Sequence, residues 1–241
     1  MIFSHSKLLN NFANLTHTFT SKIDGNLAFH VNDDLDSVIY RHKTLANKLS
    51  YDIHSLIHMK QVHSDLVHVI NENDNFDNPQ TCDALITDKK NIPLMVMVAD
   101  CSPILFYDDS KCVIGVAHAG RQGAFKNIVQ NVIDMFIHKY NSNTKDIYVS
   151  IGASISKCCY EVGREIYAEA KKLKLDYAIE KKEDTFYLNI SQILKKQLLD
   201  TGIQENNIEI SSECTSCKNE KYFSFRADSN TGRFSGIIML N

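Results

Sequence analysis

The sequence contains only three prolines and nine glycines in 241 residues, and it has no stretch rich in serine and glycine. Flexible linkers are built from such residues, so their scarcity argues against a joint between separate domains. No internal repeat is present either. A chain of this length with 44% hydrophobic residues can bury a substantial core. We therefore expect one domain over residues 1–241.

Long hydrophobic runs and a signal-like start are also missing. The longest apolar run, residues 92–99, is far shorter than the about 20 residues that a membrane-spanning helix needs. The first residues lack the basic segment and apolar stretch of a secretory signal. The net charge is only −3, and the lysines of residues 171–182 alternate with acidic and apolar residues, as on a solvated helix face. We expect a cytoplasmic protein with no membrane or nucleic-acid partner.

Hydrophobic periodicity predicts helices at residues 34–48, 124–140, 160–173 and 191–201. Short β-branched or aromatic runs bounded by turn residues predict strands at 66–70, 94–98, 104–107, 113–117, 147–151, 208–211 and 236–240. The runs at 94–98 and 113–117 are apolar on both faces, which indicates a sheet covered on both sides. The expected fold class is α/β (α+β), layered, with mixed β-sheets flanked by helices.

The candidate site begins with one of seven cysteines, an odd number for which a disulfide framework is not expected. Cys101 follows an apolar run, and His63 and His118 lie in similar settings at strand edges. Two imidazoles and one thiolate give zinc three protein ligands and leave a fourth position for water or substrate, which is typical of catalytic sites. The three positions are far apart in the sequence, so spacing alone is weak support, and each residue taken singly has a structural interpretation. The trio nevertheless favours an enzyme.

Polar residues near the trio each have two interpretations. Asp100 could orient a metal ligand or a substrate hydroxyl, or it could cap a turn. Gly120 and Gly123 flank a helix start whose amides could bind an anion, or they could simply let the chain turn. Arg226 and Arg233 could clamp an anion between guanidinium forks, or they could pair with acidic residues in a loop.

A second group of cysteines competes for a metal. It consists of the adjacent Cys158 and Cys159 and the Cys-x-x-Cys pair of Cys214 and Cys217. A closed zinc site made from all four is an alternative, although closed sites usually use two spaced pairs and adjacent cysteines fit tetrahedral geometry poorly. A thioredoxin-like redox role is disfavoured, because that motif normally opens a helix, whereas this one precedes a terminal strand.

Several short motifs occur in the order typical of one family, at residues 60–63 (Lys-Gln-Val-His), 83–88, 99–104 (Ala-Asp-Cys-Ser-Pro-Ile), 115–120 (Gly-Val-Ala-His-Ala-Gly), 158–163, 214–215, 223–226 and 231–233. On these motifs the chain resembles the YfiH/YlmD family of bacterial proteins. That family was once labelled multicopper polyphenol oxidoreductases or laccases and later described as zinc-dependent purine nucleoside phosphorylases. The resemblance covers nearly the whole chain.

The resemblance implies a fold similar to the cytotoxic necrotizing factor and YfiH-like cysteine hydrolases, with His63, Cys101 and His118 as zinc ligands. It implies phosphorolysis of adenosine, inosine, guanosine and methylthioadenosine, together with adenosine deamination. The implied partners are a purine nucleoside and phosphate, and the expected assembly is a monomer or homodimer.

On the same basis we assign roles to further residues. The expected catalytic residues are Cys101, His118, Asp100 and Asp83, the two carboxylates orienting substrate or relaying protons. The expected substrate-binding residues are Arg226, Arg121, Gln61 and Asn26, with Arg226 or Arg121 on phosphate.

The sequence departs from the family in two places. Many members have His-Ala-Gly-Trp-Arg-Gly where residues 118–123 read His-Ala-Gly-Arg-Gln-Gly. If the usual arginine contacts phosphate, Arg121 must compensate from the neighbouring position. Residues 151–157 also lack a proline and a cysteine often found there, which argues against an essential role for that cysteine.

Three alternative functions stay open. One is a metal-free cysteine hydrolase or amidase with Cys101 as nucleophile and His118 as base. Another is copper-dependent polyphenol oxidation, with copper as the alternative metal at the trio. None of the ten histidines forms a His-x-His pair, which argues against a multicopper cluster. The third is a non-catalytic role linked to peptidoglycan editing.

Overall fold

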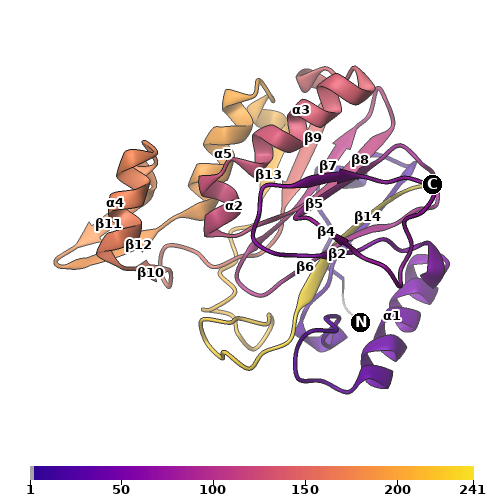
Figure 1. Cartoon of the computed structure of the whole chain (residues 1–241), viewed down its shortest axis with the longest axis horizontal. Helices are drawn as coiled ribbons and strands as arrows, with labels where there is room; N and C mark the ends of the chain where they lie inside the picture. The colour runs from indigo at the N-terminus through magenta and orange to yellow at the C-terminus, as the bar shows by residue number, and fades with distance from the viewer. Residues whose placement is uncertain (1–2) are drawn as a thin grey trace.

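Two β-sheets packed face to face form the centre of the structure, a computed structural model that describes residues 3–241 (Figure 1). The larger sheet has the strand order β13 (Ile208–Ile210), β9 (Ile147–Ile151), β7 (Ser102–Asp108), β8 (Val113–Ala119), β5 (Ala84–Thr87) and β3 (Val67–Val69). It is mixed, since β13 with β9 and β3 with β5 are parallel pairs and the others are antiparallel. The smaller, antiparallel sheet has the order β1 (Leu15–Phe19), β14 (Phe234–Leu240) and β6 (Leu94–Val98).

Helices cover the outer faces of both sheets (Figure 1). On the larger sheet lie α2 (Arg121–Phe125), α3 (Ile128–Tyr140) and α5 (Ile190–Asp200), and beside the smaller sheet lies α1 (Leu35–Leu49). A projection at the left of Figure 1 carries α4 (Arg164–Lys172) and the small sheet of β10 (Glu161–Val162), β12 (Thr185–Leu188) and β11 (Ile179–Lys182). The remaining elements are the parallel pair β2 (Met59–Lys60) and β4 (Gln80–Thr81) and short 3-10 turns at Leu9–Asn11, Lys22–Asp24, Ile53–Ser55, Thr144–Asp146, Asp176–Ala178 and Glu205–Asn207.

Alternating side chains explain why the central strands are apolar on both faces. Successive residues of a strand point to opposite faces of its sheet. In β7, Ile104 and Phe106 pack in the core between the sheet and helices α3 and α5. Leu105 and Tyr107 pack in the second core, between the two sheets. Each face of the larger sheet is thus buried against a different layer.

The smaller sheet is buried on both sides in the same way. Leu94, Val96 and Val98 of β6 face the larger sheet, whereas Met95 and Met97 face the layer that contains α1. The layered α/β arrangement with mixed sheets is therefore confirmed. The two apolar runs expected to share one sheet belong to different sheets, β6 to the smaller and β8 to the larger.

Two predicted helices have different bounds in the structure. The helix expected at 124–140 is two helices, because Asn127 has a left-handed φ of 61° and its side chain accepts a hydrogen bond from the amide of Gln130, starting α3 anew. The helix expected at 160–173 begins only at Arg164, after β10 and the N-cap residue Gly163. The other two predicted helices correspond to α1 and α5, and the seven predicted strands to β3, β6, β7, β8, β9, β13 and β14.

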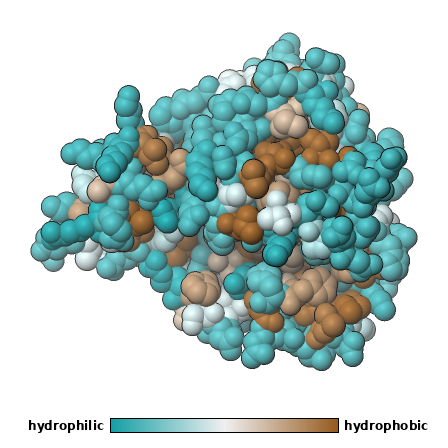
Figure 2. Space-filling model, viewed as in Figure 1, coloured by the Kyte–Doolittle hydropathy of each residue, from teal (hydrophilic) through white to brown (hydrophobic). Residues whose placement is uncertain are grey.

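Hydrophilic side chains cover most of the face shown in Figure 2, with hydrophobic residues in scattered groups. Among residues 3–241, the structure contains no helix both long and apolar enough to cross a membrane.

The packing between the sheets predicts the effect of truncating Leu105, which is 0% exposed. We expect Leu105→Ala to lower the free energy of unfolding by about 2–5 kcal/mol, because it leaves a cavity between two sheets that cannot collapse freely. Leu35→Ala is the matched control, since Leu35 is 59% exposed at the start of α1, and we expect a change below about 0.5 kcal/mol. Urea unfolding followed by circular dichroism measures both. Equal losses in the two variants would contradict this account of the core.

Candidate metal centre and pocket

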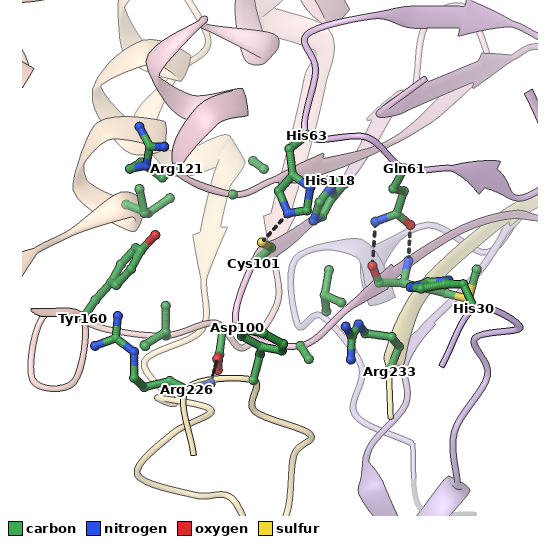
Figure 3. A pocket seen from close by; sticks show the side chains of 18 residues that line it. His30, Gln61, His63, Asp100, Cys101, His118, Arg121, Tyr160, Arg226 and Arg233 are labelled. Atoms are coloured by element: carbon green, nitrogen blue, oxygen red, sulfur yellow. Dashed lines mark hydrogen bonds between the residues drawn. The ribbon is translucent and has the colours of Figure 1, made fainter. Parts of the chain in front are cut away.

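Strand pairing brings Cys101 and His118 together. Cys101 immediately precedes β7, and His118 is the second-last residue of its antiparallel neighbour β8, paired with Pro103. His63 lies in the loop after β2 and has a left-handed φ of 58°. Its Nε2 is 3.8 Å from Cys101 Sγ. The ligand atoms of the three residues all lie within 4.8 Å of one another (Figure 3).

Gly120 leaves the room that this approach requires. A Cβ at Gly120 would lie 2.7 Å from Cys101 Sγ and 3.2 Å from Cδ2 of His63. Its backbone is extended, with φ −81°, so the requirement for glycine is steric. Any larger residue would have to displace the sulfur.

The carboxylate of Asp83 holds two of the three candidate ligands in place. Asp83 is 0% exposed, and its Oδ1 accepts a hydrogen bond from Nδ1 of His118 at 2.8 Å. The same carboxylate accepts hydrogen bonds from the amides of Val62, His63 and Ser64 and from the Ser64 hydroxyl. Because Nδ1 of His118 is used in this way, Nε2 is the nitrogen that faces Cys101. Metal-binding histidines are typically oriented by such a carboxylate.

The trio is electrostatically coupled. Burial alone would raise the pKa of Cys101, but attraction to His118 and hydrogen bonds with His118 and His63 outweigh it and lower the pKa to about 6. Burial alone would lower the pKa of His118, but the Cys101 sulfur and the Asp83 carboxylate raise it to about 9. At neutral pH the sulfur is therefore a thiolate, the form that binds metals and attacks electrophiles.

The residues fit a metal ion on three observations. Two imidazoles and one thiolate are donors that zinc and related transition metals accept. Gly120 leaves the space beside the sulfur free, and Asp83 orients the buried imidazole. The trio also lines a cavity of about 420 Å³, so a bound ion would be reached from the pocket.

Three arginines line the same cavity, and Figure 3 shows Arg121 and Arg233 on opposite sides of the trio. Nη1 of Arg121 pairs with Oε2 of Glu169 at 2.7 Å. The guanidinium of Arg226 is committed to the backbone, donating to the carbonyl oxygens of Cys159 at 2.8 Å and Glu161 at 3.0 Å.

Arg233 differs from the other two arginines. Its Nη1 donates to the carbonyl oxygens of Thr231 and Gly232 at 2.7 and 2.9 Å. Between residues 3 and 241, no carboxylate lies within 4.0 Å of its guanidinium nitrogens to form an ion pair. Its positive charge therefore remains available in the pocket.

The other predicted site residues have varied positions. Gln61 lines the cavity, and its amide bonds to both backbone groups of Met97 at 2.7 and 2.9 Å. Asp100 also lines it, with its carboxylate accepting from the Thr215 hydroxyl and the Arg226 amide, both at 2.6 Å. Asp83 lies behind His118 and outside the lining.

Asn26, predicted to bind substrate, also lies outside the lining. Its side chain accepts hydrogen bonds from the amides of Ala28 and Arg233 and donates to Ala28 and Asp33. Asn26 thus acts as a support for the backbone of Arg233.

Among the polar residues of the lining, sequence reasoning missed His30 and Tyr160. Tyr160 lies within the motif at 158–163, which was the available signal. His30 lies in an irregular segment where no pattern marks it. Burial lowers the pKa of His30, and the nearby positive charge of Arg233 lowers it further.

Comparison with known proteins gives consistent matches over the chain. Residues 19–241 match the model of the family described as multi-copper polyphenol oxidoreductase laccase. Purine nucleoside phosphorylase YlmD of Bacillus subtilis (strain 168) is 30% identical over 224 residues, which are 88% of this chain and 81% of that protein. Adenosine deaminase RL5, from an unknown prokaryotic organism, is 30% identical over 225 residues, 88% of this chain and 86% of that protein. The crystal structure of the hypothetical protein YfiH of Bacillus licheniformis aligns with a TM-score of 0.90 at 32% identity, covering 97% of this chain and 94% of that one.

The network around Asp83 predicts a large loss of stability in Asp83→Asn. We expect the free energy of unfolding to fall by about 3 kcal/mol, because several donors lose a buried charged acceptor. Asp108→Asn is the matched control, since Asp108 is also 0% exposed but its carboxylate accepts from the Lys111 amide alone, with Oδ2 lacking a partner in the described chain. Urea unfolding at pH 7 compares the two.

The same comparison has a pH dependence. Burial would raise the pKa of Asp83, but its hydrogen bonds with His118 and Ser64 dominate and lower it from 3.8 to about 2. Its contribution to stability is therefore complete above about pH 4 and is lost as the pH falls through 2. The difference between wild type and Asp83→Asn should shrink in that window. A constant difference down to pH 2 would show that the charge of Asp83 is not what stabilises the fold.

Proposed function

The chain belongs to the family described as multi-copper polyphenol oxidoreductase laccase, and from this premise we propose that it is a purine nucleoside phosphorylase that holds zinc on His63, Cys101 and His118. The ordered motifs predicted this family and the strand and helix patterns predicted a layered α/β fold, and both predictions are confirmed. The name of the Bacillus subtilis relative supplies the reaction class. The observation that carries the proposal is one cavity lined both by the trio and by Arg233.

The donor set favours a single metal ion over a multicopper centre. When bound, zinc would supply a Lewis acid that polarises an oxygen or activates water for attack. In the part of the chain that the structure describes, only two groups of His, Cys or acidic side chains are close enough to hold a metal, and only the trio contains histidine. A trinuclear copper cluster draws on more imidazoles than the trio has.

Phosphorolysis sets clear demands on the pocket. An oxygen of phosphate bonds to C1′ of the ribose while the C1′–N bond to the purine breaks, and the bonding electrons leave with the purine, which takes up a proton. Positioning phosphate against the sugar and stabilising the developing charge supply most of the rate enhancement.

Arg233 is the phosphate-binding residue that we propose. All hydrogen bonds of its guanidinium within the described residues run from Nη1, so Nε and Nη2 remain for an anion. His30 lines the same side of the cavity (Figure 3), and its lowered pKa keeps it neutral at pH 7, suited to share a hydrogen bond with phosphate. Arg226 then serves to position the pocket wall through its bonds to Cys159 and Glu161.

The purine has apolar surfaces to pack against, since Met97, Ile155, Tyr160 and Phe225 are among the residues that line the cavity. Phe225 is 55% exposed, so it is free to stack on a planar base. Apolar contacts of this kind accept any purine ring, which is consistent with activity on adenosine, inosine, guanosine and methylthioadenosine.

The departure at residues 121 and 122 weakens a phosphate role for this segment. Gln122 is exposed and does not line the cavity. Arg121 lines it but is paired with Glu169. Such partly exposed ion pairs are worth only about 0–1 kcal/mol, so Arg121 can still contribute positive charge at its end of the pocket.

Adenosine deamination is a second candidate activity, favoured by the match to adenosine deaminase RL5. In that reaction water adds at C6 of the purine and ammonia leaves. Inosine formed from adenosine without phosphate would identify it.

The first test measures base release. We expect wild-type protein loaded with zinc to release hypoxanthine from inosine only when phosphate is present, with ribose 1-phosphate as co-product. Cys101→Ser removes a ligand and should lower kcat/KM by more than about 100-fold, since even residues that merely support a ligand cost 10–100-fold. Cys112→Ser is the control, because Cys112 is an exposed cysteine outside the cavity lining.

Three outcomes would contradict the phosphorylase proposal. Base release without phosphate indicates a hydrolase. Full activity after chelation, with Cys101 alkylated equally fast with and without chelator, indicates the metal-free cysteine mechanism. Phenol oxidation that rises with several stoichiometric copper ions indicates the laccase function.

The second test addresses Arg233. We expect Arg233→Gln to raise the KM for phosphate by about 10–100-fold, the loss of a charged hydrogen bond worth about 1.5–3 kcal/mol, with a much smaller effect on the KM for inosine. Arg164→Gln is the control, since the Arg164 side chain is 78% exposed and its contact with Asp184 is long, at 3.5 Å. An unchanged KM for phosphate in Arg233→Gln would exclude Arg233 from the phosphate site.

A further inference from the structure

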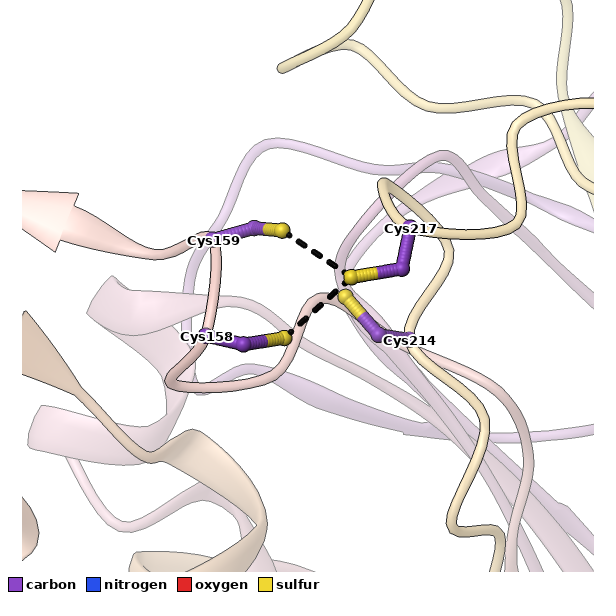
Figure 4. Close-up of side chains that lie close together, drawn as sticks. All are labelled: Cys158, Cys159, Cys214 and Cys217. Carbon is purple, nitrogen blue, oxygen red and sulfur yellow. Dashed lines mark hydrogen bonds between the residues drawn. The ribbon is translucent and has the colours of Figure 1, made fainter.

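Four cysteines outside the active site converge on one point (Figure 4). Cys158 and Cys159 lie in the turn before β10, and Cys214 and Cys217 lie in the turn after β13. Their four sulfur atoms all lie within 4.8 Å of one another. The Sγ of Cys217 is 3.4 Å from that of Cys158 and 3.3 Å from that of Cys159.

We propose that these four cysteines bind a second zinc ion in a closed site that fastens one wall of the pocket. Zinc lies about 2.3 Å from each sulfur in a tetrahedral site, so neighbouring sulfurs are about 3.8 Å apart. The sulfur separations of 3.4 and 3.3 Å at Cys217 lie slightly below that value, and all four sulfurs lie within 4.8 Å of one another. Small side-chain rotations would therefore complete the tetrahedron.

The backbone turn at residues 156–160 directs both of its sulfurs toward Cys214 and Cys217. Adjacent cysteines usually point apart, but the amides of Cys159 and Tyr160 both bond to the carbonyl of Ser156 and curl the chain into a turn. Both sulfurs then face the other pair (Figure 4). The Ser156 amide also donates to Sγ of Cys214 at 3.3 Å. Backbone amides directed at a sulfur stabilise the thiolate that zinc requires.

Disulfides are the main rival. Both close contacts involve Cys217, so a disulfide to Cys158 or Cys159 would need a second one, between Cys214 and the remaining cysteine, to use all four sulfurs. Cysteines clustered in this way are more often metal ligands than disulfides where thiols stay reduced. A tetrathiolate zinc site employs all four.

The site would act on the pocket through two short connections. Arg226 bonds to the carbonyl of Cys159, and Tyr160, the next residue, lines the cavity. Thr215, the residue after Cys214, donates to Asp100 at 2.6 Å, and Asp100 precedes the candidate ligand Cys101. Cys158 and Cys217 are 59 positions apart in the sequence, so a metal joining them would fix both connections together.

The experiment counts metal in the Cys101→Ser variant, where the trio is already disrupted. Purified under reducing conditions with zinc, this variant should retain about one tightly bound zinc per chain, as expected for a closed tetrathiolate site. Adding Cys158→Ser and Cys217→Ser should abolish that zinc, whereas adding Cys82→Ser and Cys112→Ser should leave it. Loss of zinc in the second set, or its absence from Cys101→Ser itself, would overturn the proposal.

Cobalt substitution of the Cys101→Ser variant provides a measurement that does not depend on the folding of the variants that remove cysteines of the cluster. Cobalt in four thiolates gives intense visible bands of a tetrahedral ion together with thiolate-to-cobalt charge transfer. Those bands are expected. A colourless protein would show that the cluster is empty, and an intact mass lower by two or four hydrogens under the same conditions would show that it holds one or two disulfides. Because the readout is taken without Cys101, it is independent of whether the chain is a phosphorylase.

Discussion

The buried carboxylate of Asp83 is the contact on which the candidate site depends. It lies just before β5. Its oxygens accept hydrogen bonds from three successive amides of the loop at 62–64 and from the imidazole of His118 on the neighbouring strand β8. A buried carboxylate left without these donors would cost several kcal/mol. The loop and the imidazole must therefore be in place for the chain to be stable, so the position of two candidate ligands follows from folding itself.

The third candidate ligand, Cys101, requires unusual backbone at the preceding residue. Asp100 has a φ of 84°, a conformation that costs a non-glycine residue about 1–3 kcal/mol. The Asp100 side chain offsets this cost by accepting from Thr215 and from the Arg226 amide. From the sequence, this carboxylate could either orient a metal ligand or substrate hydroxyl or cap a turn. In the structure it holds two distant segments in place. It turns the chain so that the sulfur meets the imidazoles.

Sequence reasoning succeeded where the pattern is long and periodic and failed where placement depends on distant partners. The strands β6, β8 and β14 contain apolar runs and were predicted, whereas β2, β4 and β10 have two residues each and carry no detectable period. The four- and five-residue strands β1, β5, β11 and β12 were not predicted either. Spacing could not join His63, Cys101 and His118, because strand pairing and the Asp83 network join them. Spacing also could not show which arginine is free to bind an anion. The guanidinium of Arg226 bonds to carbonyl groups at least 65 positions away, and nothing in the sequence indicates that Arg233 lacks distant partners of this kind.

The two cysteine-containing clusters differ in their surroundings, and this difference would give a bound metal ion a different role in each. Cys101 lies between two imidazoles beside a cavity, so an ion bound there would remain open to a substrate. Within residues 3–241, the sulfurs of Cys158, Cys159, Cys214 and Cys217 have only one another as metal donors, and four thiolates would leave a bound ion no open position. Two hydrogen bonds to the Asp100 carboxylate connect the clusters, one from Thr215 and one from the amide of Arg226, whose guanidinium also bonds to the carbonyl of Cys159. A metal that stiffened the cysteine turns would therefore also restrain Asp100, the residue that sets the position of Cys101. The rigidity of the pocket wall would then depend on residues that lie far from the reacting atoms.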